Sequence, residues 1–285
     1  MVTDLTLVHL SDLHFGRDVD LEQVRALETL IPTLGADAVV LAGDLTQRAR
    51  HGELQRALAF VEHLRRSTPT LVIPGNHDVQ WWRSILPLGR GRVRWRKYRR
   101  YFGEALTPVL DVPGAVLSGA LTSYGIAFGS LTWNLRDLAV KGHLPRRETK
   151  RLTKLFAAAP PDAVRVAVLH HNVLRGALSH RMGLSHWRSA QRRLLATGAD
   201  VVLCGHDHPE GAGQIDGVLP VSTSGTHTGR TRGGRPSAFN LVHVDDQAVH
   251  IQYWRWASGH REFVPSDINV FARRRRGADP GPTSA

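Results

Sequence analysis

The chain has 285 residues, of which 42% are hydrophobic and 22% are charged, and its formal net charge is +12. This length can bury a sizeable core, and we expect a single domain over residues 1–272. No apolar run approaches the roughly 20 residues needed to cross a bilayer, so the expectation is not an integral membrane protein. The positive charge favours polyanionic partners, although an arginine bias can arise without any ligand.

The first residues and the single cysteine point to the same compartment. The chain passes almost at once into the apolar run Leu5–Leu10, without the basic and long apolar regions of a signal peptide. Cys204 has no second cysteine to pair with and ends an apolar run, so we expect a small buried side chain. Both features favour a cytoplasmic location.

Apolar runs that stop at a polar cluster recur along the chain. We expect strands, in chain order, at residues 5–10, 38–42, 70–74, 164–169 and 200–204. The segments Leu21–Leu34 and Glu53–Leu64 between the first three have helical spacing, which gives a β-α-β-α-β pattern typical of strands covered on both faces. Because ligands of open α/β sheets collect at the carboxyl ends of strands, the polar clusters mark the expected site.

A basic aromatic insertion is expected at residues 81–105. Between Trp81 and Tyr101 lie eight Arg or Lys, five aromatics and no acidic residue. Trp95, Tyr98 and Tyr101 or Phe102 share one face of a helix, so the segment either packs its aromatics on the domain or forms a groove that binds nucleic acid. Packing is the favoured interpretation, because aromatics at helical spacing more often belong to a core.

The remaining elements are expected from shorter patterns. Strands are expected at residues 116–118 and 126–131, a helix at 145–158, and a hairpin formed by 239–244 and 249–256. Residues 273–285 open with four arginines and close with Gly, Pro, Thr and Ser, which predicts a disordered basic tail.

Five short blocks carry the candidate chemistry. They are Asp12-Leu13-His14, Gly43-Asp44, Gly75-Asn76-His77-Asp78, His170-His171 and Gly205-His206-Asp207-His208. Carboxylate and amide oxygens mixed with imidazole suit Mn, Fe or Zn, and the glycines before the ligands allow a close backbone approach. Any one block occurs by chance in many proteins, whereas the five together at strand ends predict a metal centre.

These blocks, in this order, resemble the calcineurin-like metallophosphoesterase family, whose pattern is D-x-H, GD, GNH(D/E), H and GHxH. The sequence is most similar to class III cyclic-nucleotide phosphodiesterases and their bacterial relatives in the segments "HLSDLHFGR", "AGDLTQRAR", "IPGNHDV" and "STSGTHTGRTRGG". Asn172 departs from the proline that usually follows the paired histidines in these relatives. The resemblance implies an α/β fold, a four-layer αββα sandwich of the metallophosphoesterase type.

The resemblance also implies a role for each residue. Asp12, His14 and His208 would bind one of two divalent or mixed-valence metal ions. Asn76, His170 and His206 would bind the other, and the choice of His170 over its neighbour His171 rests on the resemblance alone. Asp44 would bridge the two ions. His77 would act on the leaving oxygen as a catalytic residue, with the catalytic Asp78 orienting its ring.

The expected activity follows from this chemistry. A phosphodiester repels hydroxide, and two adjacent cations can both neutralise it and acidify a bound water, so the expected nucleophile is a metal-bound hydroxide. The expected substrate is a small phosphodiester, with a cyclic nucleotide as the favoured assignment. The alternatives are a nuclease, a phosphodiesterase for other small diesters or phospholipid headgroups, and a non-catalytic binding module on the same fold. Oligomeric state is left open by the sequence.

Other histidines and arginines are weighed against simpler interpretations. His9, His243 and His250 lie in strand-like runs and are expected to be hydrogen-bonded or surface residues. The segment with His227, Arg230 and Arg232 follows a strand, so it either touches the substrate phosphate or forms a solvated loop.

Overall fold

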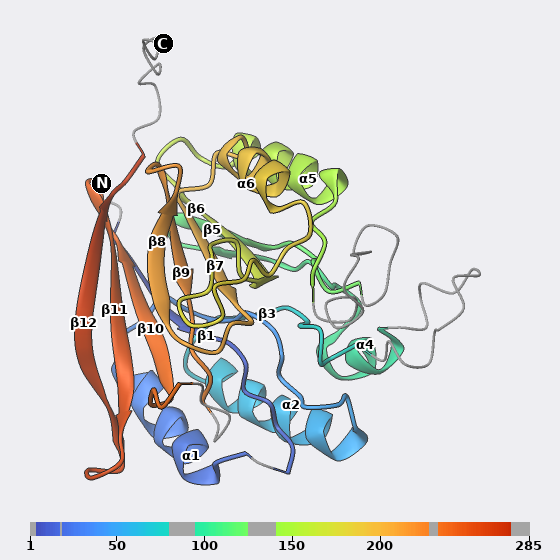
Figure 1. The fold of residues 1–285 in the computed structure, drawn as a ribbon, viewed down its shortest axis with the longest axis vertical. Helices are drawn as coiled ribbons and strands as arrows, with labels where there is room; N and C mark the ends of the chain where they lie inside the picture. The colour runs from blue at the N-terminus through green and yellow to red at the C-terminus, as the bar shows by residue number, and fades with distance from the viewer. Residues whose placement is uncertain (1–3, 18, 80–94, 125–140, 228–232, 275–285) are drawn as a thin grey trace.

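The computed structural model describes residues 4–17, 19–79, 95–124, 141–227 and 233–274. The fold consists of two six-stranded sheets packed face to face and covered by helices on both outer sides (Figure 1). The expected four-layer αββα sandwich is therefore confirmed.

The first sheet has the strand order β12-β11-β10-β1-β2-β3. Three parallel strands form one half: β1 (Leu5–Leu10), β2 (Ala38–Leu41) and β3 (Thr70–Val72). The other half is antiparallel: β10 (Ala238–Val244), β11 (Ala248–Ala257) and β12 (Glu262–Ala272). β10 pairs antiparallel with β1, with His9 opposite Asn240, and so joins the C-terminal hairpins to the N-terminal β-α-β unit.

The second sheet has the order β4-β5-β6-β7-β9-β8. Its strands are β4 (Val109–Val112), β5 (Ala115–Gly119), β6 (Val164–His171), β7 (Val201–Gly205), β8 (Gly211–Ile215) and β9 (Leu219–Thr223). The four central strands are parallel and the two edge strands run antiparallel to their neighbours. The carboxyl ends of β6 and β7 therefore lie together at one edge of this sheet.

Helices cover the outer face of each sheet. The first sheet is covered by α1 (Leu21–Leu30), the 3-10 turn η1 (Ile31–Thr33), α2 (His51–Arg65) and α4 (Arg96–Phe102). The second is covered by α5 (Arg146–Ala158) and α6 (Trp187–Leu195). Figure 1 shows α1 and α2 on one side of the sheets and α5 and α6 on the other. A third apolar cluster, with Leu7, Val40, Val166 and Leu203, fills the space between the sheets.

Several elements differ from the sequence expectations. The first helix ends as a 3-10 turn because Pro32 lacks the N–H that would continue the α-helical pattern. β4, β8, β12 and α6 were not predicted. The two short strands β4 and β8 hold few apolar residues, whereas Trp187, Ala190 and Leu194 of α6 do recur at helical spacing. The strand expected at 126–131 and the tail residues 275–285 lie outside the described residues. Arg273, placed in the tail, lies 3.3 Å from the Asp200 carboxylate.

The basic aromatic insertion is described only from Trp95 onward. Trp95 and Tyr98 are buried, and the Tyr98 hydroxyl donates to the carbonyl of Val72 at 3.3 Å. The Tyr98 and Phe102 rings pack with their centroids 4.9 Å apart. For this part of the insertion the aromatics pack on the domain, as favoured. Residues 81–94 lie outside the described residues.

Two further expectations concern burial and membranes. Cys204 is fully buried, and burial raises the pKa of its thiol to about 11, which keeps the sulfur protonated. No helix in the described part of the chain is both long enough and apolar enough to span a bilayer.

Candidate metal centre

The five polar blocks converge where the two sheets meet at the carboxyl ends of their parallel strands. The blocks of the first sheet follow β1, β2 and β3, and those of the second sheet end β6 or follow β7. Because β1, β2 and β3 are parallel to one another, and β6 and β7 likewise, each sheet delivers all of its blocks to one edge. The side chains that meet there are almost completely buried, apart from the partly exposed His77, His206 and His208.

One group of ligand atoms comes from Asp12, His14 and His208, which all lie within 4.8 Å of one another. The Nε2 atoms of the two histidines are 3.2 Å apart. Asp12 Oδ1 lies 3.6 Å from His14 Nε2 and 3.7 Å from His208 Nε2. Three nitrogen and oxygen donors facing one small volume form a site that could hold a cation.

A second group comes from Asn76, His170 and His206. The Asn76 side-chain oxygen lies 3.0 Å from His170 Nε2 and 3.1 Å from His206 Nδ1. Asp44 lies between the groups, because its Oδ2 is 3.3 Å from His170 Nε2 and 4.0 Å from His14 Nε2. The arrangement can therefore hold two metal ions with Asp44 shared between them.

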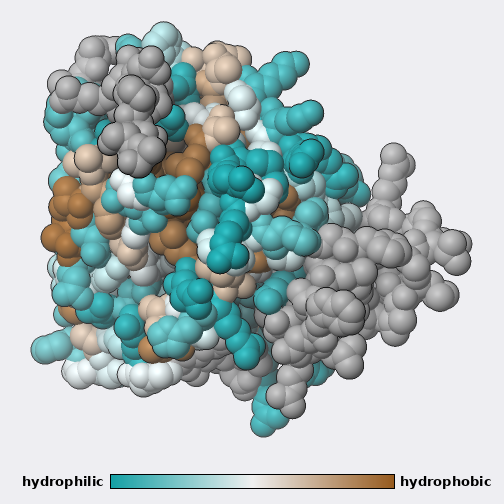
Figure 2. Space-filling view, turned by 45° about the horizontal axis from the view of Figure 1, so that its top comes forward, coloured by the Kyte–Doolittle hydropathy of each residue, from teal (hydrophilic) through white to brown (hydrophobic). Residues whose placement is uncertain are grey.

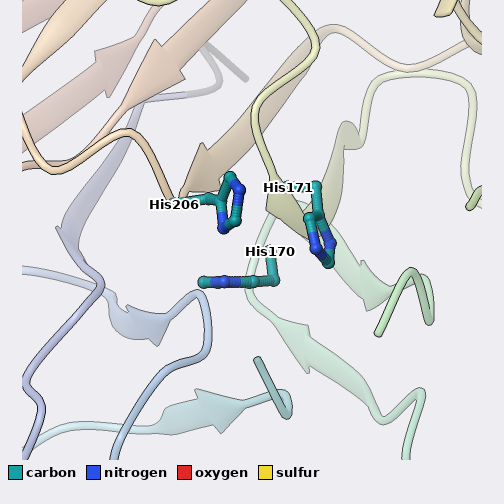
Figure 3. A group of neighbouring side chains, drawn as sticks. All are labelled: His170, His171 and His206. Atoms are coloured by element: carbon teal, nitrogen blue, oxygen red, sulfur yellow. The ribbon is translucent and has the colours of Figure 1, made fainter. Parts of the chain in front are cut away.

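The structure distinguishes His170 from His171. His170 Nδ1 is hydrogen bonded to the carbonyl of Ala42 at 2.8 Å, which turns Nε2 toward Asn76 and Asp44. His171 instead bonds through Nδ1 to the Thr122 hydroxyl at 2.8 Å, and its ring packs beside His206 with centroids 4.5 Å apart. Figure 3 shows the three rings, with His170 and His171 on adjacent positions but turned differently. His170 is thus the one that joins the Asn76 group.

The electrostatics of this centre favour a positive charge. Burial alone would raise the pKa of Asp44, but the charges of His170 and His77 hold it well below its usual value. Burial likewise opposes ionisation of Asp12, yet the neighbouring His14 ring, with Nε2 3.6 Å from Asp12 Oδ1, lowers its pKa. Burial would lower the pKa of His170, but the Asp44 carboxylate raises it to about 9. Both carboxylates are therefore ionised at neutral pH, which is the form that binds a metal ion.

A buried atom without a partner indicates that protein groups alone do not complete the site. Asp12 Oδ1 is buried and accepts no hydrogen bond from the described residues, although its other oxygen accepts from the Ser11 hydroxyl and the His206 N–H. Leaving a buried carboxylate oxygen unsatisfied is costly, and a bound cation would remove that cost. The donor set also lacks thiolates, which fits Mn, Fe or Zn.

The convergence of these loops requires uncommon backbone conformations. Asp12, Asp44, His206 and His208 all have positive φ, between 53° and 76°. Such angles cost free energy in residues other than glycine and concentrate at functional sites. A Cβ on Gly75 would overlap the backbone nitrogen of Asp44, so this glycine permits the close approach that the sequence suggested.

His77 is held in a different way from the one expected. Its Nδ1 is hydrogen bonded to the carbonyl of Gln47 at 2.8 Å, and its backbone N–H donates to Asp44 Oδ1 at 2.8 Å. Because a carbonyl only accepts, Nδ1 carries a proton and Nε2, 3.9 Å from Asp44 Oδ2, faces the centre. The expectation that Asp78 orients the ring is corrected, since Gln47 provides the partner.

Asp78 instead ties two strand-end loops together. Its fully buried carboxylate accepts hydrogen bonds from the backbone N–H groups of Leu45, Thr46 and Gly75 and from the Thr46 hydroxyl, at 2.8 to 3.1 Å. These donors flank Asp44 and Asn76 on the loops after β2 and β3. Asp78 therefore acts on the centre by fixing the backbone that carries its ligands.

This role predicts a stability effect for Asp78→Asn. The amide nitrogen of asparagine is a donor, so it would face backbone donors that now bond to a carboxylate. We expect the free energy of unfolding to fall by about 2 to 4 kcal/mol, measured by urea denaturation of the metal-free protein. The exposed Asp216, changed to Asn, is the matched control. An unchanged midpoint for Asp78→Asn would contradict the assignment.

Thr226 is a positioning residue that the sequence analysis missed. Its hydroxyl donates to the carbonyl of Asp12 at 2.8 Å, and its backbone N–H donates to the carbonyl of His208 at 2.8 Å. Thr226, which lies shortly after the end of β9, thus fixes both loops of the first ligand group. Thr226 lies within the segment "STSGTHTGR", which the sequence marked only through family resemblance, because no spacing rule links this segment to β1 and β7.

The other histidines lie outside the centre. Three have hydrogen-bonding partners: His9 with Ser222 at 2.9 Å, His243 with Thr6 at 3.1 Å, and His250 with Asp245 at 3.0 Å. Each is hydrogen bonded as expected, although His9 Nε2 is buried without a hydrogen-bond partner among the described residues.

His227 follows neither of the two expected alternatives. Its ring is fully buried, with centroids 6.3 Å from those of Phe239 and Phe263, and burial lowers its pKa to about 3. It is a neutral core residue rather than a solvated or phosphate-binding one. Arg230 and Arg232 lie outside the described residues.

A cavity of about 520 Å³ opens directly onto the centre. Its inner side is formed by Asp44, Asn76, His77, His206 and His208. Its outer side is lined by Lys141, Asn172, Ser179, Arg181, Met182, Gly183 and Asp207. The side-chain amide of Asn172, at the position that departs from the family pattern, donates to the carbonyl of Leu174 at 2.8 Å and so closes the loop on this side.

Comparison with known proteins agrees with this geometry. The model of the calcineurin-like phosphoesterase family matches residues 5–210. A dimetal phosphatase from Danio rerio is 12% identical, with a TM-score of 0.65, over 94% of this chain and 99% of that one. A purple acid phosphatase from yellow lupin (Lupinus luteus) seeds is 13% identical, with a TM-score of 0.67, over 100% of this chain and 57% of that one. A search of curated proteins finds no match.

Another similar structure is not that of a phosphatase by name. GAP50, the anchor in the inner membrane complex of Plasmodium, is 12% identical, with a TM-score of 0.58, over 96% of this chain and 90% of that one. At such identities, likeness to a solved structure shows the fold alone, so the family match and the assembled donor groups carry the assignment. The chain belongs to the calcineurin-like phosphoesterase family and is a metal-dependent phosphoester hydrolase.

Proposed function

We propose that the protein is a phosphodiesterase for small diesters, with a cyclic nucleotide as the favoured substrate. The cavity beside the centre carries this proposal. Its volume of about 520 Å³ falls within the range of small-molecule pockets, and Lys141 and Arg181 on its outer side offer positive charge to a phosphate. Met182 adds an apolar surface against which a base or another organic group can pack.

We assign the metal ligands from the two donor groups. One ion would be held by Asp12, His14 and His208. The other would be held by Asn76, His170 and His206. Asp44 would bind both ions. When bound, two such ions neutralise a phosphate and lower the pKa of a water molecule. Manganese, iron and zinc all suit these donors.

We assign His77 as the residue that protonates the leaving oxygen. Its Nε2 faces the centre and its ring lines the cavity, so it can reach a substrate oxygen there. Since Nδ1 is committed to the Gln47 carbonyl, the ring can give a proton from Nε2 only when both nitrogens are protonated.

A substrate panel tests the proposal. We expect metal-loaded protein to hydrolyse bis(p-nitrophenyl) phosphate with a higher kcat/KM than p-nitrophenyl phosphate, and to hydrolyse 3′,5′- or 2′,3′-cyclic nucleotides. Glycerophosphodiesters, single-stranded DNA and RNA are assayed in parallel. A preference for the monoester would reject the phosphodiesterase assignment. Hydrolysis of single-stranded DNA or RNA alone would mean that the protein is a nuclease and not an enzyme for small diesters.

One variant tests the outer side of the cavity. Arg181→Gln should raise the KM for a cyclic nucleotide about tenfold and leave kcat nearly unchanged, because it removes a charge-assisted contact present in both the bound substrate and the transition state. Arg175→Gln, on an exposed arginine of the same loop, is the matched control. Equal effects of the two changes would mean that Arg181 does not contact the substrate.

A further inference from the structure

The outer layer formed by α5 and α6 is strongly basic. α5 has five basic residues and one acidic residue, and α6 has three basic residues and no acidic one. These two helices therefore carry a net charge of +7, against +12 for the whole chain. Figure 2 shows hydrophilic residues gathered in the middle of the face to which this layer contributes. This layer is therefore one of the strongly basic regions of the chain, together with residues 81–101.

Most cations of this layer face outward, whereas Arg151 and Arg193 are half-buried and donate hydrogen bonds within the fold. Six of them are exposed: Arg146, Arg147, Lys150, Lys154, Arg188 and Arg192. We call these six residues the basic strip. The acidic residue of the layer, Glu148, is buried, and it lies near Arg147 and Arg151. Burial and the charges of Arg146 and Arg192 lower the pKa of Arg193, so cations from the two helices crowd one another.

The strip is regular and reaches the cavity. Arg146, Lys150 and Lys154 are spaced by four residues, which places them on one face of α5 about 6 Å apart along its axis. Lys141 and Arg181 in the cavity wall precede α5 and α6, and the segments that carry them are joined by a hydrogen bond from Gly142 N–H to the Gly183 carbonyl at 2.9 Å. Positive charge therefore continues from the cavity wall along both helices.

We propose that the basic strip binds the phosphate backbone of a nucleic acid. Repelling cations in a regular row are stabilised by a partner with closely and regularly spaced negative charges, and nucleic acids have that property. A membrane surface fits less well, because helices that lie on a bilayer expose an apolar face. The large apolar residues of α5 and α6, including Leu152, Phe156 and Leu194, are instead buried against the second sheet.

The test compares two variants with the same change in charge. The strip variant replaces Arg146, Lys150, Lys154 and Arg192 with Gln. The control variant replaces Arg25, Arg56, Arg65 and Arg66 with Gln, all exposed residues at α1 and α2 in the opposite layer. Binding of a fluorescent 16-nucleotide single strand is measured by anisotropy at several salt concentrations, with EDTA present to prevent turnover.

We expect the strip variant to bind at least about tenfold more weakly at low salt. Its slope of log affinity against log salt should be flatter by about 2 to 3, since each phosphate contact on a single strand contributes about 0.7. The control variant should stay within about threefold of the wild type. Equal losses in the two variants would overturn the proposal, because attraction would then depend on net charge alone. Binding to anionic phosphatidylglycerol vesicles without binding to the strand would overturn it as well.

A second measurement needs no variant. Acetylation of the wild-type protein, mapped by mass spectrometry, should show Lys150 and Lys154 protected by the strand and Lys97 unprotected. Protection of all three lysines alike would contradict the proposal. Hydrolysis of bis(p-nitrophenyl) phosphate by the strip variant should equal that of the wild type, so failure of the proposed activity is distinguishable from failure of the binding surface.

Discussion

Asp44→Asn is expected to remove both metal ions together and to reduce phosphodiester hydrolysis by at least about a thousandfold, or ~4 kcal/mol in activation free energy. The physical reason is its position, since Asp44 Oδ2 lies 3.3 Å from His170 in one donor group and 4.0 Å from His14 in the other. Asparagine keeps the oxygen that accepts the His77 N–H but loses the negative charge that two cations would share.

Metal content and stability measure this effect without reference to activity. At a free metal concentration one hundred times the dissociation constant, each bound ion should add about 2.7 kcal/mol to the free energy of unfolding. We expect this increment in the wild type and in Asp111→Asn, which changes an exposed carboxylate on β4, and almost none in Asp44→Asn. If Asp44→Asn still bound two ions per chain by elemental analysis, the shared-ligand assignment would be wrong.

His77→Ala should give the second large effect, a fall in kcat of about a hundredfold to ten-thousandfold with metal content preserved. His77 reaches the centre from the cavity side, and its Nε2 is 3.9 Å from Asp44, so it can lie beside the substrate without being needed to hold an ion. His206→Ala offers the contrast. Because His206 contacts Asn76 within the second donor group, its loss should lower both metal content and activity.

The leaving group separates proton donation from a general structural effect. An alkoxide leaving group needs a proton far more than p-nitrophenolate does, so the loss in His77→Ala should be larger for alkyl esters than for activated aryl esters. His260→Gln, an exposed histidine in the turn between β11 and β12, serves as the control. An equal loss on both ester classes, or a loss of metal as complete as in His206→Ala, would reject the leaving-group role.

Much of the centre was predictable because its signal is local. A buried parallel strand needs a continuous apolar run, and the residue after it emerges at the sheet edge. The strand ends at positions 10, 41 and 72 therefore indicated where the ligand blocks follow. The glycine before Asn76 is part of the same short block. In the structure, the close approach of Asp44 leaves no space for a Cβ at this glycine. Family resemblance then supplied the role of each block.

The partner of His77 could not be predicted in this way. Sequence neighbourhood suggested Asp78, but adjacent side chains in a tight turn point in different directions, and Asp78 turns inward to the N–H groups of Leu45 and Gly75. The carbonyl of Gln47, thirty residues earlier, is the group that meets Nδ1. Which of the paired histidines faces the metals was likewise decided by distant partners, Ala42 for His170 and Thr122 for His171.

The sequence by itself therefore determined the alternation of strands and helices and the type of metal-binding donor in each block, because apolar periodicity and residue type are properties of short segments. The four-layer arrangement was implied by the family resemblance. Only the tertiary structure decided what depends on contacts between segments far apart in the chain. Thr226 bonds to Asp12 across 214 residues, and α5 and α6 bring their cations together only after packing on one sheet. No local pattern encodes such contacts, because the side chains that make them are positioned by the assembled sheets.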